Sequence, residues 1–263
     1  MKLLTIITAA LAMAAPPQAV THPQPAAAVV RDSARAAVAK PFGVGEKLTY
    51  DIRFGSLKVG TGQMQVLDTE PVRGHEAYHT LFTVQGGLPI YKVNDRYESW
   101  FDTTSLSSLR YTQNIDEGSY ERQTEYEIFP DRAEYEEVNS NDPQPSVNNP
   151  LDDGSFLYFI RTVPLVVGET YTFNRYFRPD RNPVQIRVLR RERITVPAGT
   201  FDAVVIQPII KTTGLFADKG EAQIWLTDDS RRIMLQMTSK LSIGSLNLYL
   251  KSYQPPTTSA TGQ

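Results

Sequence analysis

Hydrophobic and polar residues alternate along most of the chain between about residues 41 and 253. In the first such segment, single polar residues separate Leu48, Tyr50 and Ile52. Strict alternation is typical of a β-strand with one buried face. The segments follow one another at short intervals, which predicts antiparallel neighbours. They lie at 48–54, 57–68, 77–85, 90–101, 109–115, 120–129, 133–138, 171–177, 184–196, 201–210, 220–227, 233–239 and 246–253.

One segment in the middle of the chain has the periodicity of a helix instead. Its hydrophobic residues fall on one helical face, at i, i+3, i+4 and i+7: Phe156, Phe159, Ile160 and Val163. Asp152 or Asp153 can cap its start, and Pro164 ends it. The whole pattern predicts a mainly β protein, a single large antiparallel curved sheet or barrel of about a dozen strands with one central helix packed against or inside it. The alternative is two smaller β domains that meet near residues 140–165.

Two glycines interrupt the second predicted strand. Gly60 and Gly62 lie two residues apart and therefore on one face of the strand. Glycine inside a strand indicates a strong bend or a close approach of two backbones. Both are expected in a curved sheet.

The N-terminal residues have the pattern of a cleavable signal peptide. Lys2 precedes an apolar run that ends in small residues of the A-x-A type at Ala12–Ala14. The run is shorter than the roughly 20 residues that cross a bilayer, and no cysteine follows it for lipid attachment. We therefore expect an exported protein, periplasmic or secreted and without a transmembrane segment, cleaved near Ala14. A flexible Ala/Pro-rich leader at 15–40, a β-rich domain at 41–253 and a disordered tail at 254–263 follow.

Composition argues against several kinds of chemistry. The 263 residues contain no cysteine, which excludes disulfides, thiolate metal sites and cysteine nucleophiles. The formal net charge of -2 gives no reason to expect a nucleic acid partner. His75 and His79 would lie roughly 13 Å apart on a strand, too far for one metal ion. No nucleophile elbow, P-loop or dinucleotide motif is present, so we expect no metal and no cofactor, and an enzyme is the less favoured interpretation.

Scattered carboxylates are the remaining route to catalysis, because such residues leave no local motif. Asp95, Glu98 and Asp102 lie near Tyr97 and Trp100. An acid beside aromatic rings is typical of a sugar site, and equally of an ordinary strand with salt bridges. Strand geometry places Asp95 and Glu98 on opposite faces, so no catalytic residue is predicted.

Charged residues are concentrated in two segments. Nine acidic residues lie between Asp116 and Glu137, and seven arginines lie between Arg175 and Arg193. The simpler interpretation is that these hairpins pair across the sheet or coat solvent-facing surfaces. The alternative is a patch that binds the anionic group of a phosphorylated lipid or an acidic glycan, formed by Arg187, Arg190, Arg191 and Arg193.

Short motifs follow one another along the predicted domain. They are PFGVGEKLTY at 41–50, LKVG at 57–60, VNDRYES at 93–99, VPAGTFDA at 196–203, IWLTDD at 224–229, RRI at 231–233 and GSL at 244–246. In this order they resemble the exported bacterial family known as domain of unknown function 3108, with Met234 at a position where proline is expected. The resemblance implies an exported, β-rich envelope protein with no assigned activity and no catalytic residues. The WLTDD segment is also loosely similar to periplasmic lipoprotein-carrier proteins, which bind acyl chains on a curved sheet.

Three functions stay open. The favoured one is non-catalytic binding or carriage of a hydrophobic or lipid-linked envelope molecule, because the strand at 201–206 is apolar on both faces. The alternatives are an envelope assembly or structural factor that acts through protein contacts, and a glycan hydrolase that uses scattered carboxylates. Large aromatics near the motifs and the helix face are the candidate ligand contacts, with core packing as the competing interpretation: Tyr97, Trp100, Trp225, Phe156, Phe159 and Ile160. Ligand identity and oligomeric state are not predicted.

Overall fold

The computed structural model describes residues 40–88, 91–140, 142–210, 222–240 and 245–257. The expected signal peptide, nearly all of the expected leader and the last six residues of the expected tail lie outside these ranges. Gln254 is the last residue of a strand, and the Thr257 amide donates to the Val44 carbonyl at 2.8 Å.

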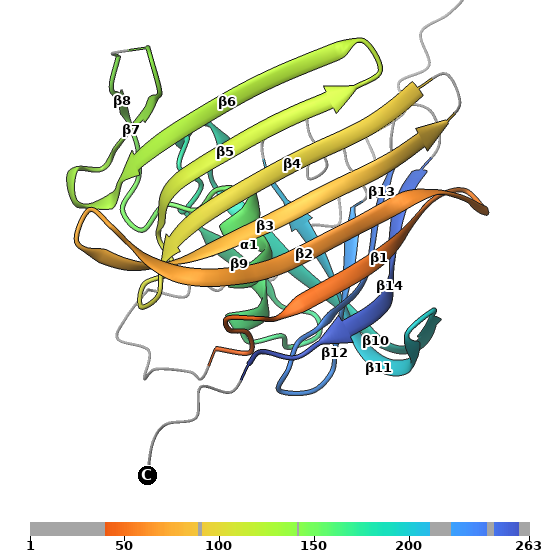
Figure 1. Ribbon diagram of the computed structural model, residues 1–263. Coiled ribbons are helices and arrows are strands. Elements are labelled where there is room, and N and C mark those ends of the chain that lie inside the picture. Colours follow the sequence, from red (N-terminus) through yellow and green to blue (C-terminus); the bar gives the residue numbers. More distant parts are fainter. Residues whose placement is uncertain (1–39, 89–90, 141, 211–221, 241–244, 258–263) are drawn as a thin grey trace, which may run out of the picture.

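One antiparallel sheet contains every strand of the described residues (Figure 1). Its order is β8-β7-β6-β5-β4-β3-β2-β1-β14-β13-β12-β11-β10-β9. The prediction of one curved sheet is confirmed, and the alternative of two β domains is wrong. The strands are β1 (Lys47–Phe54), β2 (Leu57–Val72), β3 (His75–Leu88), β4 (Tyr91–Asp102), β5 (Ser108–Glu117), β6 (Tyr120–Phe129), β7 (Glu134–Glu137), β8 (Gln144–Pro145), β9 (Thr170–Phe173), β10 (Val184–Val196), β11 (Gly199–Ile209), β12 (Gln223–Thr227), β13 (Met234–Lys240) and β14 (Ser245–Gln254).

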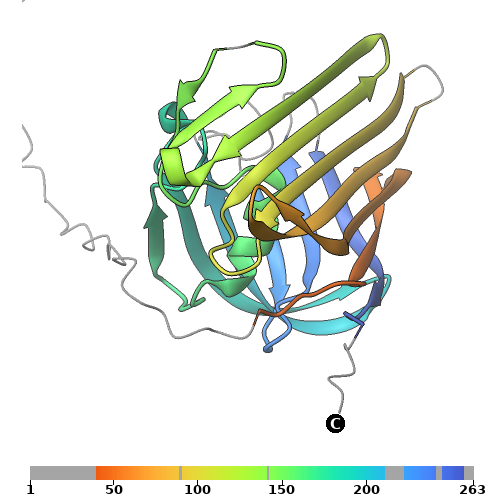
Figure 2. The ribbon, with the colours of Figure 1, turned by 60° about the vertical axis from the view of Figure 1, so that its left-hand side comes forward.

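The sheet curls around its own concave face without closing (Figure 2). The first and last strands, β1 and β14, pair in its middle, so the two edges come from the middle of the chain. Those edges, β8 and β9, do not pair within the described residues. The chain joins them by other contacts: Leu151 bridges Tyr176, and the Ser146 hydroxyl donates to the Phe177 carbonyl at 2.8 Å. β8 lies outside the segments that were predicted as strands.

The predicted helix is present and lies inside the curled sheet (Figures 1 and 2). Helix α1 spans Asp153–Phe159 and continues as a 3-10 turn at Ile160–Thr162, so the last predicted turn is tighter than an α-helix. Asp152 is the N-cap, and its carboxylate accepts from the amides of the second and third helical residues. The helix belongs to the same core as the inner side chains of the sheet.

A buried ion pair joins the end of this helical segment to the first strand. Arg161 donates to both carboxylate oxygens of Glu46, at 2.7 and 2.9 Å, and both side chains are 0% exposed. The same guanidinium donates to the carbonyls of Pro41 and Arg231, and the Tyr253 hydroxyl donates to Glu46. One arginine therefore ties the beginning of the domain, the β12–β13 turn and the helical segment together.

Close approach of β2 and β3 explains one of the strand glycines. Gly60 pairs with Gly86, and a Cβ on Gly60 would lie 2.4 Å from the Gln85 carbonyl oxygen. No side chain fits there, which confirms the expected close approach at this position. A Cβ on Gly62 would make only ordinary contacts.

The acidic and arginine-rich segments do not pair with each other across the sheet, so of the two arrangements in the simpler interpretation, pairing is wrong, whereas several of these side chains face solvent, Glu121 and Arg193 among them. Strands β6 and β7 lie toward one edge and β10 toward the other. Nearer partners neutralise these charges: Glu127 of β6 pairs with Arg110 at 2.6 Å, and Arg191 of β10 pairs with Asp228 at 2.7 Å.

Candidate functional site

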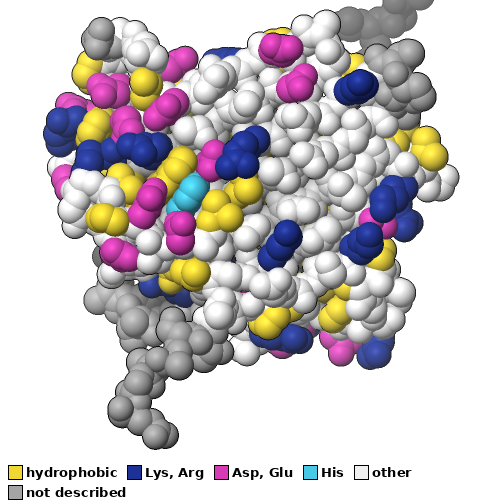
Figure 3. All heavy atoms as spheres, viewed as in Figure 1, with side chains coloured by type: hydrophobic (Ala, Val, Ile, Leu, Met, Phe, Trp, Pro, Cys, Tyr) yellow, Lys and Arg dark blue, Asp and Glu magenta, His cyan; other side chains and the backbone are white. Residues whose placement is uncertain are grey.

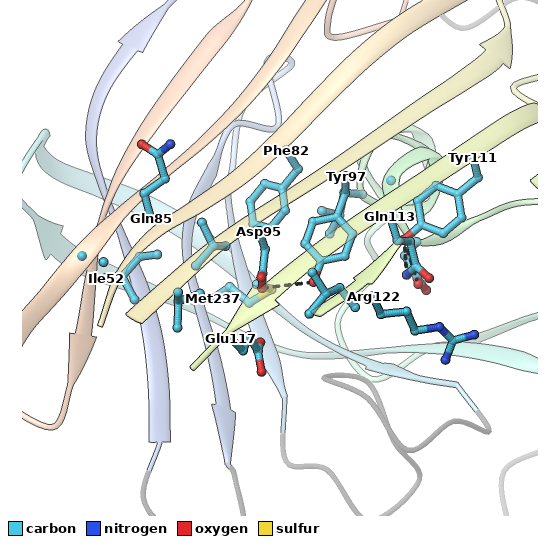
Figure 4. A pocket seen from close by; sticks show the side chains of 18 of the residues that line it. Ile52, Phe82, Gln85, Asp95, Tyr97, Tyr111, Gln113, Glu117, Arg122 and Met237 are labelled. Atoms are coloured by element: carbon cyan, nitrogen blue, oxygen red, sulfur yellow. Dashed lines mark hydrogen bonds between the residues drawn. The ribbon is translucent and has the colours of Figure 1, made fainter. Parts of the chain in front are cut away.

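A cavity of about 570 Å³ lies on the concave side of the sheet (Figure 4). It extends from helix α1, where Gly154 and Leu157 line it, to the β3–β4 turn. Tyr91 lines the turn end and is 47% exposed, so this end of the cavity reaches the surface. The volume falls within the roughly 300–1,000 Å³ typical of small-molecule sites.

One side of the cavity is apolar. Ile52 of β1, Phe82 of β3 and Met237 of β13 line it, and they lie together in Figure 4. Sheet pairing brings them there, because Ile52 and Met237 both lie opposite Leu248 of β14. This wall can bury a hydrocarbon or aromatic group.

The strands β4 and β5 supply a carboxylic acid in an apolar setting. Asp95 is 4% exposed and lies between Val84 and Ile115 on the inner face. The pKa of Asp95 is raised to about 6, mainly by burial, and the Glu117 carboxyl contributes to the rise by charge repulsion and by a hydrogen bond. The amide of Asp116 and the hydroxyl of Tyr97 donate to Asp95 and oppose this rise only in part. Asp95 therefore keeps its proton at pH values where an exposed aspartate has lost it.

The raised pKa predicts how Asp95→Asn changes stability with pH. A carboxyl whose folded pKa exceeds its unfolded value favours the folded state below the unfolded pKa, and this contribution is lost as the pH rises through about 6. At pH 7.5, Asp95→Asn should therefore raise the free energy of unfolding by about 1–2 kcal/mol. This is less than the free energy that corresponds to the whole pKa shift, because the cavity admits water. The gain should vanish near pH 4. Urea denaturation at both pH values measures it.

Asp116→Asn is the matched control for this measurement, because Asp116 neighbours Asp95 across the strands but lines the outer surface. It should change stability by less than about 0.5 kcal/mol. A gain from Asp95→Asn that is equal at both pH values would contradict the raised pKa.

Tyrosines and arginines form the other side of the cavity. Asp153 at the start of α1 accepts from the hydroxyls of Tyr176, at 2.8 Å, and Tyr111, at 3.2 Å. Gln113 donates to Tyr111 at 2.9 Å, and Arg181 donates to Tyr176 at 3.1 Å. This chain of hydrogen-bonded side chains is polar and fixed in position, because each hydroxyl is held by partners on both sides.

Two further arginines line the cavity. Arg178 donates to the Tyr126 hydroxyl, and its guanidinium carbon lies 5.0 Å from the centre of that ring. Arg122 extends from the inner face of β6 (Figure 4). The cavity is therefore amphipathic, with an apolar wall opposite a wall of hydroxyl and guanidinium groups.

Of the six predicted ligand contacts, the structure places one in the cavity. Tyr97 lines it. Phe156, Phe159 and Ile160 are buried in the core behind the cavity wall. Trp100 lies three residues after Tyr97 on the same strand and thus on the outer face. Trp225 follows Ile224, which pairs with the cavity-lining Met237, so it too points away from the cavity.

The outer face of β2–β5 carries Trp100 and both histidines of the domain. Figure 3 shows this face, where a histidine lies among acidic, basic and hydrophobic side chains. His79 stacks on Trp100 with ring centres 4.3 Å apart and hydrogen-bonds Glu98 at 2.9 Å. His75 hydrogen-bonds Asp102 at 3.3 Å. Glu98 and Asp102 thus take part in surface pairs, whereas Asp95 lines the cavity.

The predicted arginine patch also lies outside the cavity. Three of its members pair with carboxylates: Arg190 with Glu192, Arg191 with Asp228 and Arg193 with Asp202, at 3.0, 2.7 and 3.4 Å. Arg187 is exposed on the same strand. Trp225 is buried beside Arg190, and its Nε1 donates to Glu192 at 2.6 Å.

Sequence reasoning missed most of the polar cavity wall. Tyr111, Gln113 and Glu117 alternate along β5, which shows that they share a face. Nothing in the sequence says that this face is the inner one. Arg178 and Arg181 stood out only as members of a charge cluster.

Two further observations bear on function. Among the described residues, no three His, Cys, Asp or Glu side chains are grouped so that they could hold a metal ion. No helix in the same part of the chain is long and apolar enough to cross a membrane.

Comparison with known proteins identifies a family and a fold. The model of the family described as protein of unknown function (DUF3108) matches residues 49–251. A β-barrel-like protein of domain of unknown function DUF1849 from Brucella abortus has a similar structure, with a TM-score of 0.53, 11% identity, and coverage of 82% of this chain and 99% of that one. A putative lipoprotein from Parabacteroides distasonis is less similar, with a TM-score of 0.35, 9% identity, and coverage of 81% and 98%. No curated protein matches the chain.

Proposed function

The chain belongs to the DUF3108 family, a family of unknown function. From the cavity, we propose that it is an exported protein whose function is the non-catalytic binding or carriage of an amphipathic envelope molecule. The apolar wall at Ile52, Phe82 and Met237 would hold its hydrocarbon or aromatic part. The hydroxyl and guanidinium wall would hold its polar part. The amphipathic lining of one cavity that reaches the surface is the observation that supports this proposal.

Catalysis by carboxylates is less well supported. Of the three carboxylates that the sequence singled out, Asp95 lines the cavity, whereas Glu98 and Asp102 are hydrogen-bonded to histidines on the outer face. These three carboxylates therefore do not meet in one cleft. No observation favours an assembly factor over a binding protein.

Native mass spectrometry of the protein purified from its own periplasm tests the proposal. We expect a bound molecule that dissociates on activation and is found by organic extraction. A clean mass of the unliganded chain would contradict the proposal. Val93→Trp and Asn94→Trp form a matched pair, because these neighbours on β4 face the cavity and the outer surface.

Val93→Trp should displace the bound molecule, since overpacking costs about 1–3 kcal/mol and about 1.4 kcal/mol corresponds to tenfold in affinity. Asn94→Trp should leave the bound fraction unchanged. Equal loss from both variants, or from neither, would place the molecule elsewhere on the protein.

A further inference from the structure

Two arginines on one short segment line the polar end of the cavity. Arg178 precedes a 3-10 turn and Arg181 is the last residue of that turn. Within the described residues neither has a carboxylate oxygen within 4.0 Å, and their contacts are to tyrosine hydroxyls instead. Arg191 and Arg193, which do not line the cavity, are both paired with aspartates.

Aromatic rings hold both guanidinium groups in place. Arg178 lies over the rings of Tyr126 and Phe177, at 5.0 and 5.5 Å from their centres. Arg181 lies 5.3 Å from the centre of the Tyr176 ring. Stacking fixes the plane of a guanidinium and leaves its edge, with the N–H donors, available for an oxygen ligand.

The backbone that carries the two arginines is braced by one side chain. Asn182 accepts from the Tyr176 amide at 2.8 Å and donates to the Tyr176 carbonyl at 2.9 Å and to the Arg178 carbonyl at 3.4 Å. Asn182 is itself buried. The arginines are therefore positioned before any ligand arrives, which lowers the entropic cost of binding.

The donors of Arg178 are under-used. A guanidinium has five N–H groups, and within the described residues Arg178 donates one hydrogen bond, to Tyr126. Its Nε is buried and has no hydrogen-bond partner there. Most buried polar groups in proteins are satisfied, so this arginine lacks the oxygen acceptors that its neighbours on β10 have.

The acids near this end act on Arg181 rather than on Arg178. Asp153 and Arg181 are both hydrogen-bonded to the Tyr176 hydroxyl, and Asp153 and Asp180 also attract Arg181 by charge. Asp95 and Glu117 line the cavity from β4 and β5, and burial raises the pKa of Asp95. Arg122 on β6 adds a third cation to the lining.

We infer that the molecule bound in the cavity carries an anionic head group, a phosphate or a carboxylate, which Arg178 and Arg181 bind while its apolar part lies along Ile52, Phe82 and Met237. This inference rests on the proposed binding function. Arginine is suited to such groups because its N–H donors match the spacing of two carboxylate or phosphate oxygens.

Amphiphiles with one chain and different head groups test the inference. Dodecyl phosphate, dodecanoate, dodecyl maltoside and dodecyltrimethylammonium are titrated into the delipidated protein below their micelle concentrations, with isothermal titration calorimetry as the readout. Both anionic molecules, or one of them, should bind at least about tenfold more tightly than dodecyl maltoside. The stronger of the two identifies the head group. The cationic molecule should bind most weakly.

Variants and added salt test whether the two arginines cause the preference for anionic head groups. Arg178→Gln with Arg181→Gln should reduce the ratio of the affinities for the anionic molecules and for dodecyl maltoside to about one, while dodecyl maltoside still binds. Arg193→Gln, outside the cavity, should leave this ratio unchanged. Should the double variant fail to fold, sodium chloride gives the same answer on the parent protein, because it weakens charge-dependent binding and leaves dodecyl maltoside unaffected.

The outcomes separate the inference from the proposed function. Equal affinity for all head groups, or a preference that survives the double variant, would overturn the anionic head group and leave amphiphile binding in place. Binding of none of the four molecules would overturn both.

Discussion

Glu46→Ala should lower the free energy of unfolding by about 3–5 kcal/mol, because it leaves the Arg161 guanidinium charged and buried without its carboxylate. Both side chains are 0% exposed, so water cannot replace the missing partner. The carbonyls of Pro41 and Arg231 satisfy part of the guanidinium and do not balance its charge. Urea denaturation followed by circular dichroism measures the loss.

A second variant separates the cost of an unpaired charge from the value of the pair. Glu46→Leu combined with Arg161→Met replaces both partners by apolar side chains, and such replacements are often neutral. The double variant should recover most of the stability that Glu46→Ala loses. Asp202→Ala, which breaks an exposed pair with Arg193, should cost less than about 1 kcal/mol. A loss from Glu46→Ala as small as this would show that the buried arginine finds another partner.

The curved sheet and its helix were predictable because both follow from local periodicity. The alternation at Leu48, Tyr50 and Ile52 appears in the structure as three buried residues of β1. The four-residue spacing between Phe156 and Ile160 appears as a buried helical segment, and one of the two proposed caps, Asp152, is the N-cap. Periods of 2 and 3.6 residues are properties of the backbone, so a single sequence carries them.

The cavity was less predictable because it depends on which face of each strand is the inner one. On β4, the alternation of side chains places Tyr97 and Trp100 on opposite faces whatever the fold. The two residues could therefore not both contact a ligand on one face of the strand. Alternation alone does not say which of the two faces inward. That choice follows from the direction in which the whole sheet curls, and the curl depends on pairings such as Gly60 with Gly86.

Contacts between distant segments were beyond any local pattern. Arg178 reaches Tyr126 across 52 residues of sequence, and Arg161 reaches Glu46 across 115. Clusters of arginine and of acid in the sequence suggested that they pair with each other, yet several of these charges have nearer partners, as Glu127 has Arg110 and Arg191 has Asp228. Charge counts do not specify partners, because many exposed arrangements have nearly the same energy.

The position of helix α1 beside the cavity depends on its N-cap. Asp152 is fully buried, and its carboxylate accepts from the Gly154 and Ser155 amides at 2.7 and 2.9 Å and from the Ser99 hydroxyl of β4 at 2.7 Å. A helix of seven residues has little stability of its own. The cap therefore fixes both the start of the helix and its attachment to the sheet, and through Asp153 it fixes the hydroxyl chain of the cavity.

Asp152→Ala should accordingly lower the free energy of unfolding by about 2–4 kcal/mol, since a lost cap costs about 0.5–2 kcal/mol and a buried hydroxyl left without its acceptor about 1–3 kcal/mol. Asp152→Asn keeps the oxygen that accepts from the two amides and should lose less stability than Asp152→Ala.

Burial raises the pKa of Asp152 to about 6, although the hydrogen bonds from Ser99 and Ser155 oppose this rise. The parent protein therefore loses stability as the pH rises through that value. The deficit of Asp152→Asn should thus shrink between pH 5 and pH 8 by roughly 1 kcal/mol or more. A deficit independent of pH would mean that Asp152 is ionised throughout and that its hydrogen bonds outweigh its burial.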